Sequence, residues 1–251
     1  MGSMNKLKTY KSSNSQAGQD MFVLNLLQNK RKGVYVEIGS GDAIKGNNTL
    51  ILERSFDWNG LSIEIDESLV NRFSSTRKNK VICADATVFD FEKSFDEANF
   101  PIQIDYLQVD VYSAAANLGI LKRLLLSKYR FSIITFEHDL YRSKENRQIK
   151  ECSEKILEEN NYFKYADNVK VFFPNRSQSG NWVPFEDWWV DSKLFGSILN
   201  CPSSGSRFID IFDYSFKSKF KFRAQFLLMQ AKIVKNYLDK FLKRISRTIS
   251  K

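Results

Sequence analysis

The feature that most constrains this chain is a regular alternation of short apolar, β-branched runs with segments of helical spacing. The runs predict five strands, at residues 34–38, 61–65, 80–84, 104–109 and 130–136. The helical segments lie between and around them, at residues 21–27, 50–56, 67–75, 118–128 and 147–159. An antiparallel hairpin is predicted last, at residues 162–166 and 169–173. This order predicts an α/β fold with an open, mostly parallel sheet.

Acidic residues end all five predicted strands. They are Glu37, Glu64, Asp85, Asp110, and Glu137 with Asp139. Acids often follow strands because they cap the next helix. Ligands of open parallel sheets, however, bind outside the carboxyl ends of the strands. Five acids in register, beside a glycine-rich turn, therefore favour a binding site.

The turn after the first strand differs from a dinucleotide fingerprint. Gly39 and Gly41 let the backbone approach a ligand closely, but Asp42 would repel a pyrophosphate and suits a cation. Glu64 is placed to accept hydrogen bonds from ribose hydroxyls, and Asp85 from an adenine amine. A nucleoside with a cationic amino-acid tail fits this array. S-adenosylmethionine is such a ligand, with its ammonium near Glu37, Asp42 and Asp110.

Motifs in matching order resemble the FkbM family of S-adenosylmethionine-dependent methyltransferases. They are SQAGQD at 15–20, VEIGSG at 36–41, NTL at 48–50 with Glu53, WNGLSIE at 58–64, and YLQVD at 106–110. Later segments are similar to a subgroup of bacterial and large-virus surface-sugar methyltransferases. These segments are KYRF at 128–131, FEHD at 136–139 and PFEDWWV at 184–190. Together the matches span roughly residues 15–195.

The resemblance implies a Rossmann-like class I methyltransferase fold and O-methylation, often of a sugar hydroxyl. It also implies that Gln19, Asn48 and Thr49 contact the cofactor, beside the glycines and acids of the strand ends. Many family members have Asp-x-Glu-Gly after the fourth strand. This chain has Asp110-Val-Tyr-Ser113 there, so no role of that glutamate is carried over.

Transfer of a methyl group to a sugar hydroxyl needs a proton acceptor. His138 is the candidate base, because it is the single histidine, follows the fifth strand, and belongs to a residue type that titrates near pH 6.5. Glu137 or Asp139 would orient its ring. Asp110, Glu137 and Asp139 are also hard ligands for Mg²⁺ or Mn²⁺. The cofactor's ammonium explains these acids equally well, so metal dependence stays open.

Candidate residues for binding a carbohydrate lie beyond the predicted hairpin. Tryptophan rings stack on sugar faces and carboxylates bind hydroxyls, which suits the paired residues Glu186, Asp187, Trp188 and Trp189. The alternative is that the tryptophans belong to the core, and we expect one to face inward and one to face the site. Tyr112 and Tyr141 are further candidates for lining the pocket.

The formal net charge of +9 is concentrated in the C-terminal part of the chain. Residues 217–251 carry eleven Lys or Arg residues and one acid, while the remainder is close to neutral. Apolar residues recur there at helical spacing, which is typical of a basic amphipathic helix at an anionic membrane surface or on a partner protein. Docking on its own domain is the alternative. We expect a cloning remnant at residues 1–4, a methyltransferase domain at 5–200, a linker at 201–216 and this tail at 217–251.

The three cysteines are dispersed and no uninterrupted apolar run is long enough to span a bilayer. These features predict a cytoplasmic protein, peripheral at the inner membrane surface if the tail binds lipid. The leading hypothesis is a sugar O-methyltransferase. The alternatives are an RNA or cap methyltransferase, for which no RNA-binding module is recognisable, and a non-catalytic cofactor-binding scaffold that recruits a partner through the tail.

Overall fold

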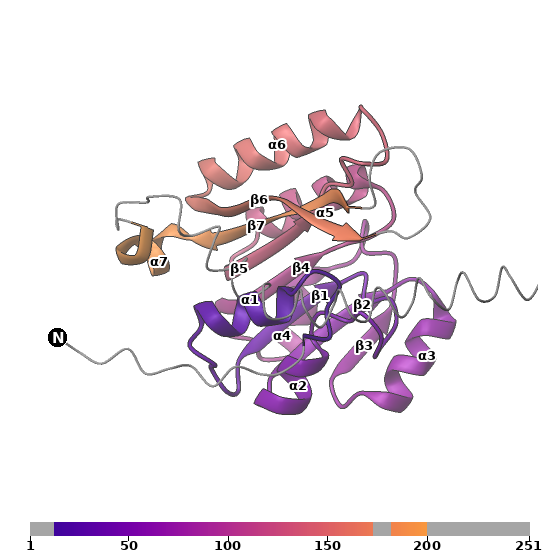
Figure 1. The fold of residues 1–251 in the computed structure, drawn as a ribbon. Helices are drawn as coiled ribbons and strands as arrows, with labels where there is room; N and C mark the ends of the chain where they lie inside the picture. Colours follow the sequence, from indigo (N-terminus) through magenta and orange to yellow (C-terminus); the bar gives the residue numbers. More distant parts are fainter. Residues whose placement is uncertain (1–12, 173–181, 200–251) are drawn as a thin grey trace, which may run out of the picture. The chain divides into compact units, whose positions relative to one another are not determined.

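The computed structural model describes residues 13–172 and 182–199. Within them a seven-stranded sheet lies between two layers of helices (Figure 1). The strands are β1 (Val34–Ile38), β2 (Asn59–Glu64), β3 (Lys80–Cys83), β4 (Gln103–Val109), β5 (Arg130–Glu137), β6 (Tyr162–Phe172) and β7 (Trp182–Asp191). The helices are α1 (Gln19–Leu26), α2 (Leu50–Phe56), α3 (Glu67–Thr76), α4 (Phe91–Glu97), α5 (Ala114–Leu126), α6 (Asn146–Glu159) and α7 (Ser192–Leu199).

The strand order across the sheet is β3-β2-β1-β4-β5-β7-β6. The first five strands are parallel, and β7 runs antiparallel to both β5 and β6. The expected α/β fold, with a Rossmann-like, mostly parallel sheet and an antiparallel C-terminal pair, is confirmed. The chain winds outward from β1 and then returns to β4, so the carboxyl ends of β1 and β4 form the topological switch point where such sheets bind ligands.

The predicted members of the antiparallel pair are wrong. Residues 162–166 and 169–173 do not form two strands of a hairpin, because residues 162–172 belong to the single strand β6. The register of β6 shifts between Lys164 and Lys170, and Asn168 has a left-handed φ of 53°. Strand β6 pairs instead with β7, which contains residues 186–189, the acidic and tryptophan-rich segment predicted to bind a sugar. Proline is disfavoured inside a sheet because it has no backbone N–H to donate, so Pro184 argues against a strand when the sequence is read alone.

Helices α4 and α7 are absent from the sequence-based expectation, and α5 begins at Ala114 rather than at residue 118. The start of α4 is capped by Asp90, whose carboxylate accepts a hydrogen bond from the Lys93 backbone N–H at 3.1 Å. The side chain of Ser113 caps α5 in the same way, accepting from the Ala116 N–H at 3.2 Å. Such caps supply the first-turn N–H groups with acceptors and so define where each helix begins.

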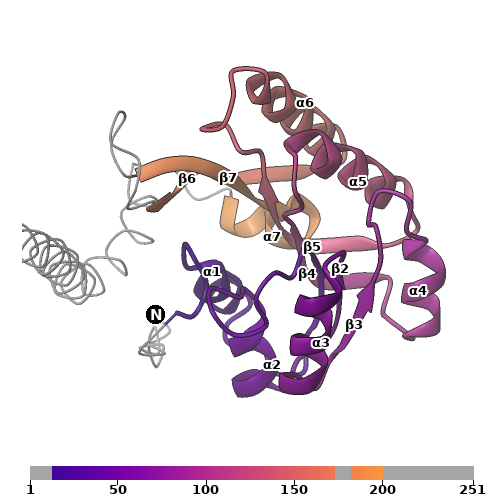
Figure 2. The ribbon, with the colours of Figure 1, turned by 90° about the vertical axis from the view of Figure 1, so that its right-hand side faces the viewer.

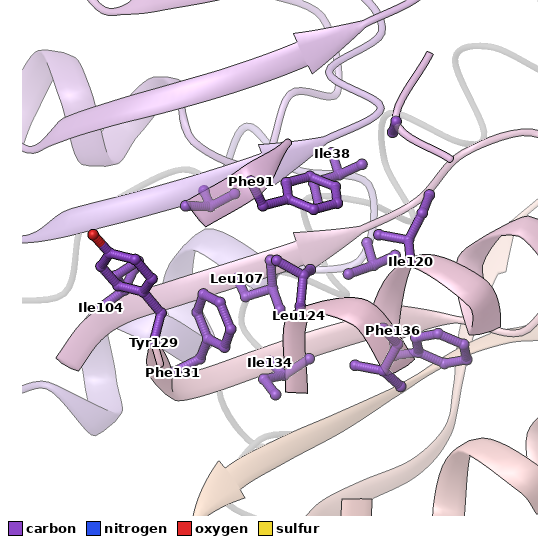
Figure 3. Packing of buried hydrophobic residues seen from close by; sticks show 14 of the residues in the cluster. Ile38, Phe91, Ile104, Leu107, Ile120, Leu124, Tyr129, Phe131, Ile134 and Phe136 are labelled. Carbon is purple, nitrogen blue, oxygen red and sulfur yellow. The ribbon is translucent and has the colours of Figure 1, made fainter. Parts of the chain in front are cut away.

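An apolar core fills one face of the sheet. Helices α4, α5 and α6 cover this face, and α1, α2 and α3 lie on the other (Figure 2). Large buried side chains of α4 and α5, such as Phe91 and Leu124, pack on Leu107, Phe131 and other residues of the central strands (Figure 3). Burying a side chain of this kind contributes about 1.5–3 kcal/mol, so this face is a major source of the hydrophobic stabilisation.

The opposite face buries polar as well as apolar side chains, and its polar groups are organised by the buried side chain of Arg77, which follows α3. Its Nε donates to Glu53 Oε2 at 2.9 Å, and the terminal nitrogens donate to oxygens of four other groups. These are the Ala43 carbonyl (3.1 Å), Asn47 Oδ1 (2.9 Å), Tyr35 OH (3.2 Å) and Thr49 Oγ1 (3.0 Å). The guanidinium therefore joins β1, α2, α3 and the loop that follows the first glycine turn.

The chain divides into two units, Met1–Cys201 and Pro202–Lys251, and all described residues belong to the first. The remnant expected at residues 1–4, the linker at 201–216 and the basic tail at 217–251 lie outside the described residues. Where the structure describes the chain, it has no helix that is both long enough and apolar enough to cross a bilayer.

We predict that Arg77→Met lowers the free energy of unfolding by about 3–5 kcal/mol, because it leaves the buried carboxylate of Glu53 without its partner. Urea unfolding measures this change. The matched control is Arg72→Met, which removes an ion pair with Asp42 whose side chains are 54% and 26% exposed. The control should cost at most about 1 kcal/mol. Equal losses in the two variants would contradict the organising role of Arg77.

Candidate functional site

The turn after β1 brings the ends of three strands together. The Asp110 N–H donates to the Ile38 carbonyl at 2.9 Å, and the Gly39 N–H donates to the Ile63 carbonyl at 2.9 Å. Gly39 has φ +81°, and a Cβ there would lie 1.7 Å from the Asp110 carbonyl oxygen. Gly41 has φ +56° and open space where its Cβ would stand. The turn thus requires glycine at position 39 and leaves the backbone at Gly41 open to a ligand.

Glu64 ends β2 beside this turn, with its carboxylate held by three backbone donors. Oε2 accepts from the Gly41 N–H at 2.9 Å, and Oε1 accepts from the N–H groups of Ile65 and Asp66 at 2.8 and 3.0 Å. An ionised carboxylate has about four acceptor positions, so one remains for a ligand. Ile65 presents an exposed apolar side chain next to it.

A carboxyl cluster, defined here as Asp110, Glu137 and Asp139, lies at the ends of β4 and β5. The Glu137 carboxyl lies within hydrogen-bonding reach of both of the other members. Burial, followed by these acidic neighbours, raises the pKa of Glu137 far above its usual range, so Glu137 carries a proton and donates it. Burial also raises the pKa of Asp110, which in addition experiences the charge of Glu64. Acids from β2, β4 and β5 therefore act on one another at a single edge of the sheet.

Glu186 of β7 extends this acidic region, because it pairs in register with Glu137. The Trp188 indole N–H donates to Glu186 Oε1 at 2.5 Å, and the side chain of Gln19 is also hydrogen-bonded to Glu186. Burial raises the pKa of Glu186 well above its ordinary value. Gln19 and Glu186, predicted as cofactor and substrate ligands, thus meet each other beneath the cluster.

Two residues that sequence reasoning missed hold the cluster. Asn117 Oδ1 accepts from the Val111 N–H at 2.7 Å, and its Nδ2 donates to the Glu137 carbonyl at 3.0 Å. Arg142 Nε pairs with Asp139 Oδ2 at 2.7 Å. A lone asparagine in the otherwise apolar start of α5 was the available signal for Asn117. The exposed position of Arg142 in a loop gave no comparable signal.

No protein-family model matches this chain, and no curated protein is similar to it in sequence. Solved methyltransferase structures are similar in fold. A putative O-methyltransferase from Klebsiella pneumoniae is 16% identical with a TM-score of 0.47, over 74% of this chain and 84% of that protein. An O-methyltransferase from Bacillus cereus, in complex with SAH, is 17% identical with a TM-score of 0.45, over 73% and 84%. A putative rRNA-methylase from Clostridium thermocellum is 12% identical with a TM-score of 0.46, over 71% and 98%. At these values, function has to be derived from the residues of the site.

Three predicted cofactor acids do not join the cluster. Glu37 is buried under the sheet, where it accepts hydrogen bonds from Asn47, Thr49 and Ser62 at 2.7–3.1 Å. The Asp42 carboxylate accepts hydrogen bonds from the N–H groups of Ile44 and Lys45 and forms an ion pair with Arg72. Asp85 is exposed and accepts from the backbone and hydroxyl of Thr87 in its own loop.

Of the other predicted cofactor residues, Thr49 is fully buried and donates to Glu37. Asn48 is buried, and its Oδ1 has no hydrogen-bond partner among the described residues. A buried amide oxygen without a partner is costly. Asn48 is therefore a predicted cofactor residue with an acceptor still to be satisfied.

The structure does not place His138 in the position expected of a general base. The ring is fully buried, and both of its nitrogens have partners. Nδ1 accepts from the Leu140 N–H at 3.2 Å, and Nε2 lies 3.3 Å from Asp187 Oδ1. In this arrangement neither ring nitrogen is free to approach a substrate hydroxyl, whereas a general base must lie within hydrogen-bonding distance of the proton it removes.

The expectation that one tryptophan faces the site is also wrong, because Trp188 and Trp189 are both buried. Trp188 stacks on Phe22 of α1 at 4.3 Å between ring centroids, and Trp189 belongs to the apolar core on the other face. Asp187 lies on the same face of the sheet as Trp189 and is equally buried. Tyr141 is partly buried near Asp139, whereas Tyr112 is 92% exposed on the loop after β4.

Acids with the spacing of a possible cation site also occur away from the carboxyl cluster, for which metal binding was left open. Carboxylate oxygens of Glu154, Asp167 and Asp187 lie within 4.8 Å of one another. The Lys150 ammonium already contacts all three, at 2.6 Å from Asp167 and 2.9 Å from Asp187. A lysine thus supplies the positive charge there. In the carboxyl cluster, burial and the neighbouring acids raise the pKa of Glu137, and a proton there reduces the repulsion between the acids.

Glu37 makes a pH dependence testable. Burial raises the pKa of Glu37 from 4.5 to about 7. Its protonated form therefore stabilises the fold fully below about pH 4.5. Between there and about pH 7 the unfolded chain releases the proton while the folded chain keeps it, so this contribution is lost as the pH rises.

We predict that the free energy of unfolding falls less between pH 5 and pH 8 in Glu37→Gln than in the unaltered chain, by roughly 2–3 kcal/mol. Urea unfolding at a series of pH values measures the difference. Glu67→Gln, at an exposed position at the start of α3, is the control and should keep the original pH dependence. Parallel curves for all three proteins would show that Glu37 does not bind this proton.

Proposed function

We propose that this protein is an S-adenosylmethionine-dependent O-methyltransferase that acts on a sugar hydroxyl of a polysaccharide or glycan precursor. The observation that carries the proposal is the position of Glu64. Three backbone N–H groups hold its carboxylate at the end of β2, across the open Gly41 turn and beside the carboxyl cluster. This edge suits a nucleoside whose other end is positively charged.

The residues around Glu64 suit the nucleoside part. The remaining acceptor position of Glu64 is available to a ribose hydroxyl, which donates well to a carboxylate. Ile65, 69% exposed, offers an apolar surface to the face of a base. Gly41 leaves room for close approach because no side chain projects from its α-carbon. These features support recognition of an adenosine-like group without a phosphate.

The carboxyl cluster suits the charged end. Together with Glu64 and Glu186 it forms an acidic region that would repel a phosphate and attract a cation. S-adenosylmethionine carries an ammonium and a sulfonium group, and when bound it supplies an electrophilic methyl group to an acceptor oxygen. The residues present therefore fit this cofactor better than they fit a dinucleotide.

The cluster also provides a candidate proton acceptor in place of His138, whose ring is buried. Asp110 is partly exposed, whereas Glu137 and Asp139 are buried. A raised pKa makes the Asp110 carboxylate a stronger base than an ordinary aspartate. We assign to Asp110 the role of accepting the proton that the acceptor hydroxyl would release on taking the methyl group, whose bond to sulfur would break in the same step. Asp139 is held beside Glu137 by Arg142, and the proton of Glu137 can be donated to Asp110.

Tyr112 supports a carbohydrate acceptor. Its ring is exposed two residues beyond Asp110, where an aromatic face can stack on a sugar. The loop that carries it is fixed on both sides, by Asn117 at Val111 and by the Ser113 side chain at the start of α5. Ser113 has φ +90°, a strained conformation for a non-glycine residue. A strained, anchored loop that exposes an aromatic ring suits a binding surface.

We predict that Glu64→Gln weakens binding of S-adenosylhomocysteine by about 10–100-fold, because an amide N–H₂ would face backbone donors and the negative charge would be lost. Isothermal titration calorimetry measures the affinity. Glu67→Gln is three residues away and exposed, and it should bind like the unaltered protein. Absence of binding by the unaltered protein would refute the cofactor assignment and the proposed function with it.

The substrate class is tested by transfer from labelled S-adenosylmethionine to nucleotide sugars, oligosaccharides and RNA, with and without EDTA. We expect label on a sugar acceptor, insensitive to EDTA.

Tyr112→Ala should raise the KM for that acceptor about tenfold, consistent with about 1–1.5 kcal/mol for an aromatic contact, and leave cofactor affinity unchanged. Tyr112→Phe should retain the original KM. The control is Leu126→Ala, an exposed residue at the end of α5. Label on RNA alone would overturn the sugar assignment.

A further inference from the structure

We propose that His138 is a positioning residue, which fixes the backbone of Asp139 through Leu140 and is itself fixed from α6 through Asp187 and Lys150. The inference rests on the proposed function, because the carboxyl cluster that Asp139 belongs to is the proposed centre of proton transfer. It assigns the single histidine of the chain a role different from that of a base.

The first step is the strained conformation of Asp139. Its φ is +51°, a region that non-glycine residues occupy only where their surroundings hold them. Several hydrogen bonds do so. The N–H groups of His138 and Asp139 both donate to the Phe185 carbonyl, at 2.9 and 3.0 Å, and Asn146 Nδ2 donates to the Asp139 carbonyl at 2.9 Å.

The histidine ring supplies the next bond along the chain. Because Nδ1 accepts from the Leu140 N–H, it carries no proton, and the ring proton belongs on Nε2, which faces Asp187 Oδ1. The ring thus ties the residue that follows Asp139 to β7. Without it, the turn at Asp139 would lose a constraint on the side facing the core.

The far side of the ring is held by a buried ionic network. Asp187 Oδ1 also accepts from the Asn168 N–H at 2.7 Å, and Asp187 Oδ2 lies 2.9 Å from the Lys150 ammonium. That ammonium contacts Asp167 and Glu154 as well. Asp187 is therefore immobilised between β6 and α6, and the ring cannot turn away from Leu140 without breaking this arrangement.

Three substitutions separate positioning from proton transfer. In His138→Asn the amide oxygen can replace Nδ1 as the acceptor for Leu140. In His138→Gln the amide can reach Asp187 but not Leu140, and His138→Ala replaces neither contact. We expect kcat for sugar methylation to fall at most about fivefold in the asparagine variant and about 100-fold in the other two. A base role predicts an equal loss of about 10²–10⁴-fold in all three, which would overturn the proposal, as would undiminished kcat in all three.

Nuclear magnetic resonance gives a readout that does not depend on activity. The chain has one histidine, so ¹⁵N-labelled untagged protein gives one imidazole spin system without assignment. We expect a proton on Nε2 and none on Nδ1 at pH 7.5, and a Leu140 amide that is protected from exchange in the unaltered protein and His138→Asn but not in His138→Gln. A proton on Nδ1, or equal protection in all variants, would overturn the proposal.

Two controls keep this inference distinct from the proposed function. Lys155→Gln, on the exposed side of α6, should match the unaltered protein in kcat and in thermal unfolding. Calorimetry with S-adenosylhomocysteine tests the proposed function alone. If the unaltered protein fails to bind it, the proposed function fails, while the tautomer and exchange measurements still decide how His138 holds Leu140.

Discussion

The buried guanidinium of Arg77 is the interaction on which the ligand edge of the sheet depends. A buried cation is strongly destabilising unless its donors are all satisfied, and here five acceptors surround it. Two of them, Ala43 and Asn47, belong to the loop that leaves the Gly41 turn. The position of that turn, and hence of the N–H that holds Glu64, follows from a charge buried on the opposite side of the loop.

Acids serve two purposes in this protein, and their position along each strand separates them. Glu37 lies one residue before the end of β1 and points under the sheet, where hydroxyl and amide groups enclose it. Glu64 ends β2 and is held at its edge. Glu37 therefore stabilises the loop beneath the candidate site, whereas Glu64 forms part of its surface. Both residues nevertheless precede a loop by similar distances in the sequence.

The parallel part of the fold could be predicted because buried strands such as β1 and β4 are near-continuous apolar runs between clear breaks. The antiparallel part could not. The Asp167-Asn168 pair has the composition of a turn yet forms an irregularity within β6. Pro184 lies within β7, although proline is rare inside a sheet. In the site, strand ends indicated Glu64, Asp110, Glu137 and Asp139, which lie at one edge of the sheet, but not that Glu37 and Asp85 would lie away from them. The burial of His138, Trp188 and Trp189 depends on β7 lying between β5 and β6, which no local pattern indicates.

The proton held by the carboxyl cluster couples ligand charge to acidity. Glu137 keeps its proton because burial and two neighbouring acids disfavour a third negative charge. A cation placed beside the cluster offsets that penalty, so binding of positive charge and release of a proton are thermodynamically linked. A cation bound beside the cluster would therefore be held more strongly as the pH rises.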